Sequence, residues 1–249
     1  MRNGANLITL LAVCIFIFSC KKVTEQFSSD PVTDYIPSAV GKYIIYRLDS
    51  TVFTNFGSTI EVHSYHEKDS VDAQIPDALG RPSYRILRYL RDVTDTLQWQ
   101  QSSVFWITPT AKTVEVMEDN LRVIKLVLPI VNGFSWKGNE YLDSTPYNDI
   151  YPNWNESLGM HDWNYTYDSV GATLTLNGKT LNNTITVNSV NQQLNWPPSP
   201  SVPYSSNTFL QEKYAKGIGL IYQNFIMEDF DATRNYKGFG VTRTMIDHN

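Results

Sequence analysis

The chain has 249 residues, of which 42% are hydrophobic and 18% charged, with a formal net charge of −5. This mildly acidic composition contains no basic run, which argues against nucleic acid as a partner. A domain of this size buries about 70% or more of its unfolded surface, so its core can be sufficient for stability.

The N-terminus carries Arg2, then an apolar run from Leu7 to Phe18, then the small residue Ser19. As a helix the run would be about 18 Å long, whereas the hydrocarbon core of a bilayer is roughly 30 Å thick. This order of features is typical of a secretory signal peptide, and a buried helix in a soluble domain is the alternative. We therefore expect residues 1–19 to be a signal peptide.

The sequence Ile17-Phe18-Ser19-Cys20 resembles the lipobox of bacterial lipoproteins, although Phe18 departs from the usual small or β-branched residue. The resemblance implies cleavage before Cys20, acylation of Cys20, and attachment to a membrane through the lipid. Two or three acyl chains make such an anchor stable. Because no aspartate follows Cys20, similarity to other lipoproteins implies the outer membrane, at its periplasmic face or at the cell surface.

Residues 20–37 are polar and contain two prolines, so we predict a flexible tether there. From residue 38 to residue 249 the pattern is that of strands, with short β-branched and aromatic runs separated by turn residues. Asp119-Asn120 and Asn177-Gly178 are hairpin turn signals. No sustained helical period is present, so the sequence predicts an all-β domain. We expect a single curved antiparallel sheet that closes into a half barrel or barrel, with long irregular loops.

Two long stretches interrupt the strands, at residues 143–162 and 195–207, and both are rich in aromatic residues or proline. Long loops are often functional, and exposed aromatic rings can stack on sugars or anchor a partner. The speculative ligand-binding residues are therefore Tyr151, Trp154, Trp163 and Trp196. The alternative is that these rings hold their own loops against the barrel.

Several common chemistries are not indicated. Gly217 and Gly219 lack the third glycine and the following helix of a dinucleotide site, so a turn or bulge is expected there. His63 and His66 would point to opposite faces of a strand, so we predict no metal site. We also expect no cofactor.

Acidic residues could still carry a site. Glu228, Asp229 and Asp231 lie close together but do not follow the calcium-loop pattern, so a solvated turn is the preferred interpretation. A pair of carboxylates could serve glycoside hydrolysis, but the sequence does not identify the pair. No catalytic residue is predicted.

Three segments have the pattern of an aspartate, then a serine or threonine, then an aliphatic residue. They contain Ser70, Thr96 and Ser169. The pattern is similar to the O-glycosylation motif of Bacteroidetes envelope proteins, which makes these residues speculative modification sites.

Two longer segments, IPSAVGKYIIYRLDS near the start and EKYAKGIGLIY near the end, carry a wider resemblance. They resemble the N-terminal strand and C-terminal hairpin of uncharacterised Bacteroidetes envelope lipoproteins. The resemblance covers residues 35–249 and implies a curved antiparallel sheet or half barrel. It implies no known activity and transfers no catalytic residue.

We therefore expect a lipid-anchored cell-envelope protein of unknown activity that binds a ligand or partner rather than acting as an enzyme. A surface lipoprotein that binds glycans is the alternative, and an envelope hydrolase is a third hypothesis. The expected partners are the membrane, through lipidated Cys20, and a glycan or an apolar small ligand.

Overall fold

The computed structural model describes residues 29–151, 154, 159–231, 233 and 235–249. Cys20 and the predicted signal peptide therefore lie outside the described residues. Besides strands, the described part contains the short 3-10 helices η2 (Val32–Tyr35), η3 (Asn55–Gly57) and η5 (Met160–Asp162). None of the helices in this part is long and apolar enough to cross a membrane.

The strands form one twelve-stranded antiparallel sheet with the order β6-β5-β4-β3-β2-β1-β12-β11-β10-β9-β8-β7. The predicted all-β fold, a curved sheet closing into a barrel, is confirmed. The strand bounds are β1 Tyr43–Thr54, β2 Thr59–Pro76, β3 Pro82–Asp92, β4 Gln100–Pro109, β5 Thr113–Glu118, β6 Leu121–Val127, β7 Ser135–Lys137, β8 Asn164–Leu176, β9 Lys179–Leu194, β10 Ser205–Ala215, β11 Gly219–Phe230 and β12 Tyr236–His248.

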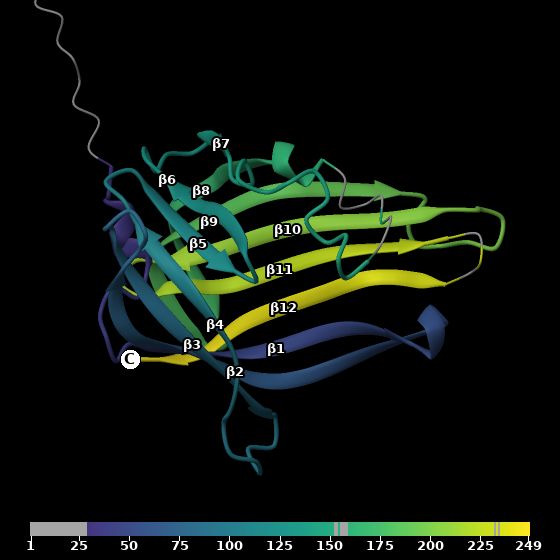
Figure 1. Ribbon diagram of the computed structural model, residues 1–249, viewed down its shortest axis with the longest axis horizontal. Helices are drawn as coiled ribbons and strands as arrows, with labels where there is room; N and C mark the ends of the chain where they lie inside the picture. Colours follow the sequence, from purple (N-terminus) through teal and green to yellow (C-terminus); the bar gives the residue numbers. More distant parts are fainter. Residues whose placement is uncertain (1–28, 152–153, 155–158, 232, 234) are drawn as a thin grey trace, which may run out of the picture.

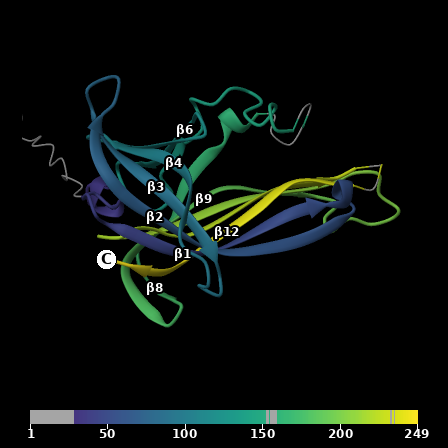
Figure 2. The ribbon, with the colours of Figure 1, turned by 60° about the horizontal axis from the view of Figure 1, so that its bottom comes forward.

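The sheet closes into a barrel at one end only. β2 pairs with β1 from Thr59 onward, but its pairing with β3 begins only at Tyr65. On the other side of the sheet, the pairing of β9 with β8 ends at Asn188, and β9 itself continues beyond that residue. The ends of β2, β1, β12, β11, β10 and β9 therefore project beyond the barrel, and we call them the sheet extension. Figures 1 and 2 show the short strands β3–β6 curling over the long strands, which continue into this extension.

Side chains rather than a continuous strand ladder join the two edges of the sheet, β6 and β7. One backbone bond runs from Ile124 N to Gly138 O, over 2.7 Å. The indole of Trp136 donates to Ile124 O over 2.9 Å, and the hydroxyl of Tyr167 donates to Val127 O over 2.9 Å. We call this junction the seam.

The closed end of the barrel is plugged by η2. Val32, Tyr35 and Ile36 are only 2%, 1% and 5% exposed and pack in the main hydrophobic core. Lys216, in the turn between β10 and β11, binds Asp30 over 2.7 Å and Asp34 over 3.2 Å. Residues 32–36 fall within the predicted tether, so the folded domain begins further toward the N-terminus than the predicted boundary at residue 38.

The long connection between β7 and β8 crosses the inner face of the sheet extension (Figure 1). Trp154 and Met160 form a small core with Met227 of β11. Tyr147 stands edge-on to Phe239 of β12, with ring centroids 5.4 Å apart. This loop therefore covers the open end of the barrel, from which the sheet extension projects.

Candidate functional site

The middle of the barrel interior holds a set of charged and polar side chains, which we call the charged belt. They come from strands that are far apart in the sequence and lie on the inner face together with apolar core residues such as Val71 and Ile86. The belt consists of Glu67, Asp69, Arg88, Glu118, Lys125, Glu212, Gln223 and Arg243.

Arg88 of β3 is the hub of the belt. Its Nε and Nη2 atoms donate to the two carboxylate oxygens of Asp69, over 2.8 and 2.9 Å. Its guanidinium also binds Glu118 and lies 3.4 Å from Glu67. Arg243 of β12 donates to the same Glu67, with its Nε 2.6 Å from Oε1. The two arginines thus hold three carboxylates, of which Glu67 and Asp69 are buried and Glu118 is partly exposed.

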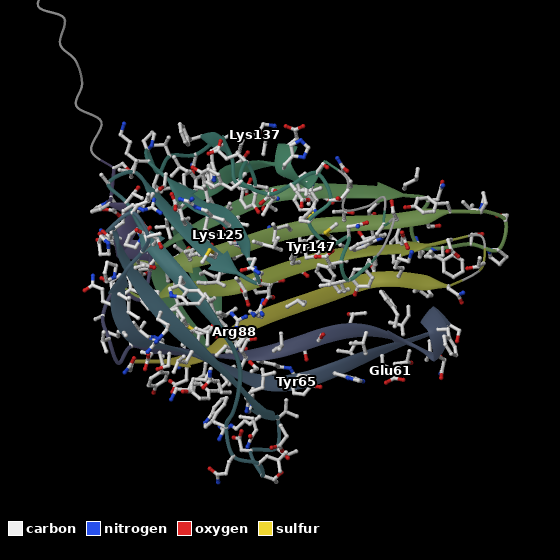
Figure 3. The ribbon with its side chains drawn as sticks, in the orientation of Figure 1. Glu61, Tyr65, Arg88, Lys125, Lys137 and Tyr147 are labelled. Atoms are coloured by element: carbon white, nitrogen blue, oxygen red, sulfur yellow. The ribbon has the colours of Figure 1, made fainter. Side chains whose placement is uncertain are left out.

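Lys125 reaches across the barrel from β6 to Glu212 on β10. Its Nζ lies 2.6 Å from Oε1 of Glu212, which is 1% exposed. Tyr214 and Gln223 each donate to the same carboxylate over 2.8 Å. Burial raises the pKa of Glu212, but Lys125 and these two donors outweigh it, so the pKa lies below its usual value. Figure 3 shows Arg88 and Lys125 where the short strands cross the long ones.

The pKa values of Asp69 and Glu67, two of the carboxylates beside Arg88, are shifted in opposite directions. Burial raises the pKa of Asp69 to about 6, against the pull of Arg88 and with the charge of Glu67 adding to the rise. Burial acts in the same direction on Glu67, but Arg243 and Arg88 outweigh it, so the pKa of Glu67 lies below its usual value. Of Glu67, Asp69 and Glu212, Asp69 is therefore the one that takes up a proton first on acidification.

We expect the free energy of unfolding to respond to Asp69 between pH 7 and pH 5. Because its pKa is higher in the folded than in the unfolded chain, the folded state binds a proton that the unfolded state does not. Its contribution to stability should therefore rise by about 1 kcal/mol as the pH falls from 7 to 5. Urea unfolding of the wild type and Asp69→Asn at both pH values tests this. The same pH response in both proteins would contradict the assignment.

The belt separates two cavities. The inner one, of about 100 Å³, lies toward the plug and is lined by residues such as Tyr35, Ile86 and Phe105. The outer one, of about 460 Å³, opens between the belt and the β7–β8 loop. We call it the mouth cavity. Its floor is formed by Glu118, Lys125, Gln223 and Arg243, and its apolar walls by Val116, Leu121, Val123, Leu142, Tyr147, Ile150, Met160, Trp163, Tyr165, Leu210, Phe225, Phe239 and Val241.

One of the four predicted ligand-binding aromatics, Trp163, lines the mouth cavity, where its ring stands edge-on to Phe225 with centroids 6.4 Å apart. Trp154 is 3% exposed, and its indole donates to Asp229 over 2.9 Å. That ring holds its own loop against the sheet, which is the alternative that the sequence left open.

The other two predicted aromatics lie outside the mouth cavity. Tyr151 packs on Trp154, with ring centroids 4.8 Å apart, and donates to Gly238 O over 3.1 Å. Trp196 is half-buried and stands edge-on to Tyr236 on the sheet extension. The structure therefore does not bring the four rings together into one site.

The predicted modification sites are spread over the molecule. Ser70 lies in β2 and Ser169 in β8, and both are half-buried. Thr96 is exposed in the turn between β3 and β4, where its hydroxyl donates to Asp92 over 2.8 Å. Thr96 is thus the most accessible of the three hydroxyls.

The predicted solvated turn at residues 228–231 is wrong for its first two residues. Glu228 and Asp229 are only 9% and 7% exposed, because β11 extends through both of them. Asn207 donates to Glu228 over 2.8 Å, and Asp229 accepts from Trp154. These buried acids therefore fasten β10 and the β7–β8 loop to β11.

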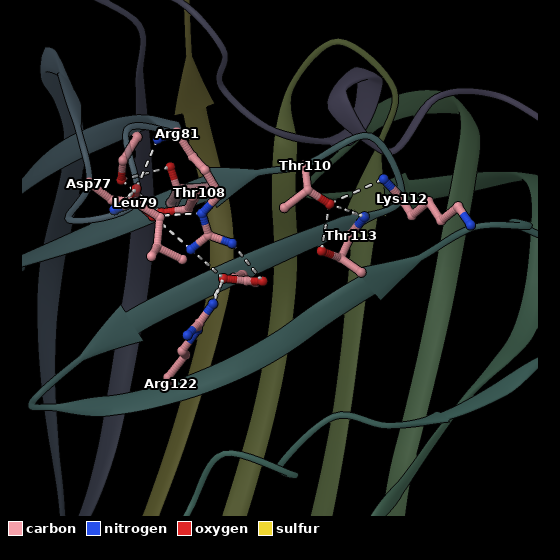
Figure 4. Close-up of polar contacts among 11 residues, drawn as sticks. Asp77, Leu79, Arg81, Thr108, Thr110, Lys112, Thr113 and Arg122 are labelled. Atoms are coloured by element: carbon pink, nitrogen blue, oxygen red, sulfur yellow. Dashed lines mark hydrogen bonds and ion pairs between the residues drawn. The ribbon is translucent and has the colours of Figure 1, made fainter.

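A second polar cluster lies on the outer face of the barrel. Glu115 of β5 accepts from Arg81, over 3.1 and 3.2 Å, and from Nε of Arg122, over 3.0 Å. Arg81 also donates to Asp77 over 2.7 Å, and Figure 4 shows Asp77, Arg81 and Arg122 converging in this way. These contacts tie the β2–β3 turn to β5, so we assign the cluster a structural role.

Comparison with known proteins gives only distant likenesses. No family model matches the sequence, and no curated protein shows significant similarity to it. A protein from Bacteroides fragilis, proposed to be exported and described as having a YmcC-like fold, has 7% identity and a TM-score of 0.40. This likeness covers 86% of this chain and 99% of that one.

Two further structures show similar or weaker likeness. A proposed lipoprotein from Parabacteroides distasonis has 6% identity and a TM-score of 0.42, over 86% of this chain and 97% of that one. LprF from Mycobacterium bovis has 10% identity and a TM-score of 0.23, over 82% and 85%. Only the first two neighbours are described as an exported protein or a lipoprotein, and the function proposed below does not depend on any of the three.

Proposed function

We propose that this chain is a lipid-anchored envelope protein that binds a small amphipathic ligand in the mouth cavity. The observation that carries the proposal is the cavity itself, about 460 Å³, with aromatic and aliphatic walls over a charged floor. Ligand sites are typically clefts of about 300–1,000 Å³ with apolar walls and a few polar groups. The plug closes the opposite end of the barrel, so a ligand would enter from the side of the sheet extension.

The ion pairs of the charged belt favour a role in ligand binding over a role in catalysis. Glu67, Asp69, Glu118 and Glu212 each accept from a guanidinium or an ammonium group, which holds them in place. Paired carboxylates of this kind stabilise a polar floor at fixed geometry, whereas a hydrolase needs an acid and a base directed at a substrate. We therefore favour a binding protein over the hydrolase hypothesis.

Glycan binding is the second candidate function, and it is supported by the position of Trp163 on the cavity wall. Sugars need many hydrogen-bonding partners as well as a stacking ring, and the walls of this cavity are largely apolar. An apolar or amphipathic ligand is therefore the better match. If Trp163→Ala abolished binding to a polysaccharide array and left apolar probes unaffected, the order of these two candidates would be reversed.

The anchoring part of the proposal is supported by the sequence Ile17-Phe18-Ser19-Cys20. Intact mass measurement of the protein purified from membranes tests it. We expect a chain that begins at Cys20 and carries two or three acyl chains. An intact Met1, or an unmodified Cys20, would contradict the proposed lipid anchor but would leave the proposal of ligand binding in the mouth cavity unaffected.

Filling the mouth cavity should weaken ligand binding. Val241 lines the cavity from β12, so in Val241→Phe the larger ring would occupy space that a ligand needs. We expect the dissociation constant for N-phenyl-1-naphthylamine, an uncharged fluorescent probe, to increase at least about tenfold, which corresponds to roughly 1.4 kcal/mol. Fluorescence titration of the whole mature protein provides the measurement.

The matched control is Val62→Phe, the same substitution at a β2 side chain that is 61% exposed and does not line the cavity. This variant should bind the probe like the wild type, and thermal melts of both variants check folding. The proposal fails if the wild type does not bind the probe, or if Val241→Phe binds it as tightly as Val62→Phe does.

A further inference from the structure

The charges around the mouth cavity are not balanced. The belt beneath it holds four carboxylates, Glu67, Asp69, Glu118 and Glu212, against the three cations Arg88, Lys125 and Arg243. Both cations that line the cavity, Lys125 and Arg243, are already bound to buried carboxylates. The floor therefore offers no free positive charge to an incoming anion.

The rim of the cavity adds further negative charge. Asp119, in the turn between β5 and β6, and Asp149, in the β7–β8 loop, are both exposed and line the cavity. Among the described residues, neither carboxylate has a cationic partner within ion-pair distance. Burial raises the pKa of Tyr147, on the same wall, and the charges of Glu118 and Asp119 add to that rise. Tyr147 thus lies in a negative electrostatic field.

The walls present aromatic rings next to these carboxylates. Trp163 and Phe225 stand edge-on to each other, and Phe225 is edge-on to Phe239 with centroids 5.1 Å apart, so neighbouring rings are nearly perpendicular. A cation over the face of such a ring is attracted by the negative face of the π-system, and most strongly where water is excluded. The aromatic lining consists of Tyr147, Trp163, Tyr165, Phe225 and Phe239.

We propose that the ligand of the mouth cavity is an amphipathic cation, with an apolar body against the aromatic walls and an ammonium-type group near Asp119 and Asp149. This inference rests on the proposed binding function and names the class of ligand for that same cavity. The aliphatic and aromatic walls accept the body. The rim carboxylates and the negative net charge of the belt select the sign of the head group.

Three amphiphiles with alkyl chains of eleven or twelve carbons separate head-group preference from simple apolar binding. Dodecyltrimethylammonium, dodecanoate and dodecanol, each below its critical micelle concentration or solubility limit, compete with N-phenyl-1-naphthylamine for the whole mature protein at pH 7.5. We expect the cation to displace the probe at a concentration at least about tenfold lower than dodecanoate. Raising the salt concentration should narrow the difference, because the rim carboxylates are exposed.

The double variant Asp119→Asn/Asp149→Asn removes the rim charge. We expect the preference for the cation over dodecanoate to fall to about threefold or less, while displacement by dodecanol stays unchanged. The matched control, Asp34→Asn/Asp247→Asn, changes the net charge equally but alters residues that do not line the cavity. It should keep the preference.

The outcomes distinguish the two proposals. If the probe and all three amphiphiles fail to bind the wild type, the proposed binding function is wrong. If they bind without preference for the cation, or dodecanoate binds more tightly, the cavity binds ligands but the inference about the cation is overturned. The inference is also overturned if both double variants lose the preference equally.

Discussion

Replacing Arg88 by methionine is expected to lower the free energy of unfolding by about 3–5 kcal/mol. Arg88 is 7% exposed and holds Asp69, Glu118 and Glu67 together at the centre of the barrel. Methionine keeps much of the apolar stem, so the main loss is the charge, which leaves buried carboxylates without their cation. Urea unfolding followed by tryptophan fluorescence measures the change.

The pH dependence of that loss separates charge from packing. At pH 5 the uncompensated carboxylates can take up protons, so the loss should be smaller there than at pH 8. The control is Arg47→Met on β1, where the side chain is 52% exposed and lies 3.0 Å from Asp49. A surface pair of this kind contributes at most about 1 kcal/mol. If Arg88→Met were no more destabilising than this control, the role of the belt would be refuted.

Replacing Gly138 by alanine is expected to cost about 2–3 kcal/mol and to disturb the seam. A methyl group at this position would lie 2.3 Å from Cδ2 of Tyr165, well inside contact distance. Tyr165 is 2% exposed, and its ring centroid is 5.9 Å from that of Trp136, so the ring has little room to move. Since Trp136 donates to Ile124 O across the seam, the strain should reach the junction of β6 and β7.

Tyr165 also lines the mouth cavity, so Gly138→Ala should weaken probe binding as well as stability. A double-mutant cycle with Tyr165→Ala checks the mechanism. Once the ring is absent, the glycine substitution should cost less than about 0.5 kcal/mol. A cost that is the same in both backgrounds would show that the methyl group does not act through Tyr165.

Much of the fold could be predicted because its local patterns are strong. Asp119 and Asn120, with φ of 51° and 62°, form the β5–β6 turn, and Asn177 and Gly178 form the β8–β9 turn, both as predicted. Gly217 and Gly219 have φ of 78° and 123° at the β10–β11 turn, as expected for glycines between strands. The residue types that such turns need can be recognised in the sequence of the turn itself.

The candidate site could not be predicted in the same way, because its residues meet through long-range register. In the sequence of β3, the alternation of side chains puts Arg88 on one face with Tyr84, Ile86 and Leu90. An arginine among apolar residues on one face is a sign of a buried charge, but nothing local identifies its partners. The pair formed by Arg243 and Glu67, 176 residues apart, becomes visible only once β12 is known to lie near β2.

The plug was missed for a related reason. Val32, Tyr35 and Ile36 lie among polar residues and two prolines, so composition favoured a tether. Their burial depends on the closed end of the barrel, which forms from strands further along the chain. Likewise, Trp154 and Trp163 look alike in sequence, and only the path of the β7–β8 loop directs one into a small core and the other onto the cavity wall.

The pairing of β1 with β12 has a consequence for biosynthesis. Ile44 lies opposite His248 and Thr51 opposite Gly240, so β1 can pair with β12 only after β12 has been synthesised, whereas β2 follows β1 directly. Contacts between such distant segments form slowly, because a long loop must close first. We therefore expect the sheet to be completed through β12 late in folding, after the hairpin of β1 and β2 has formed.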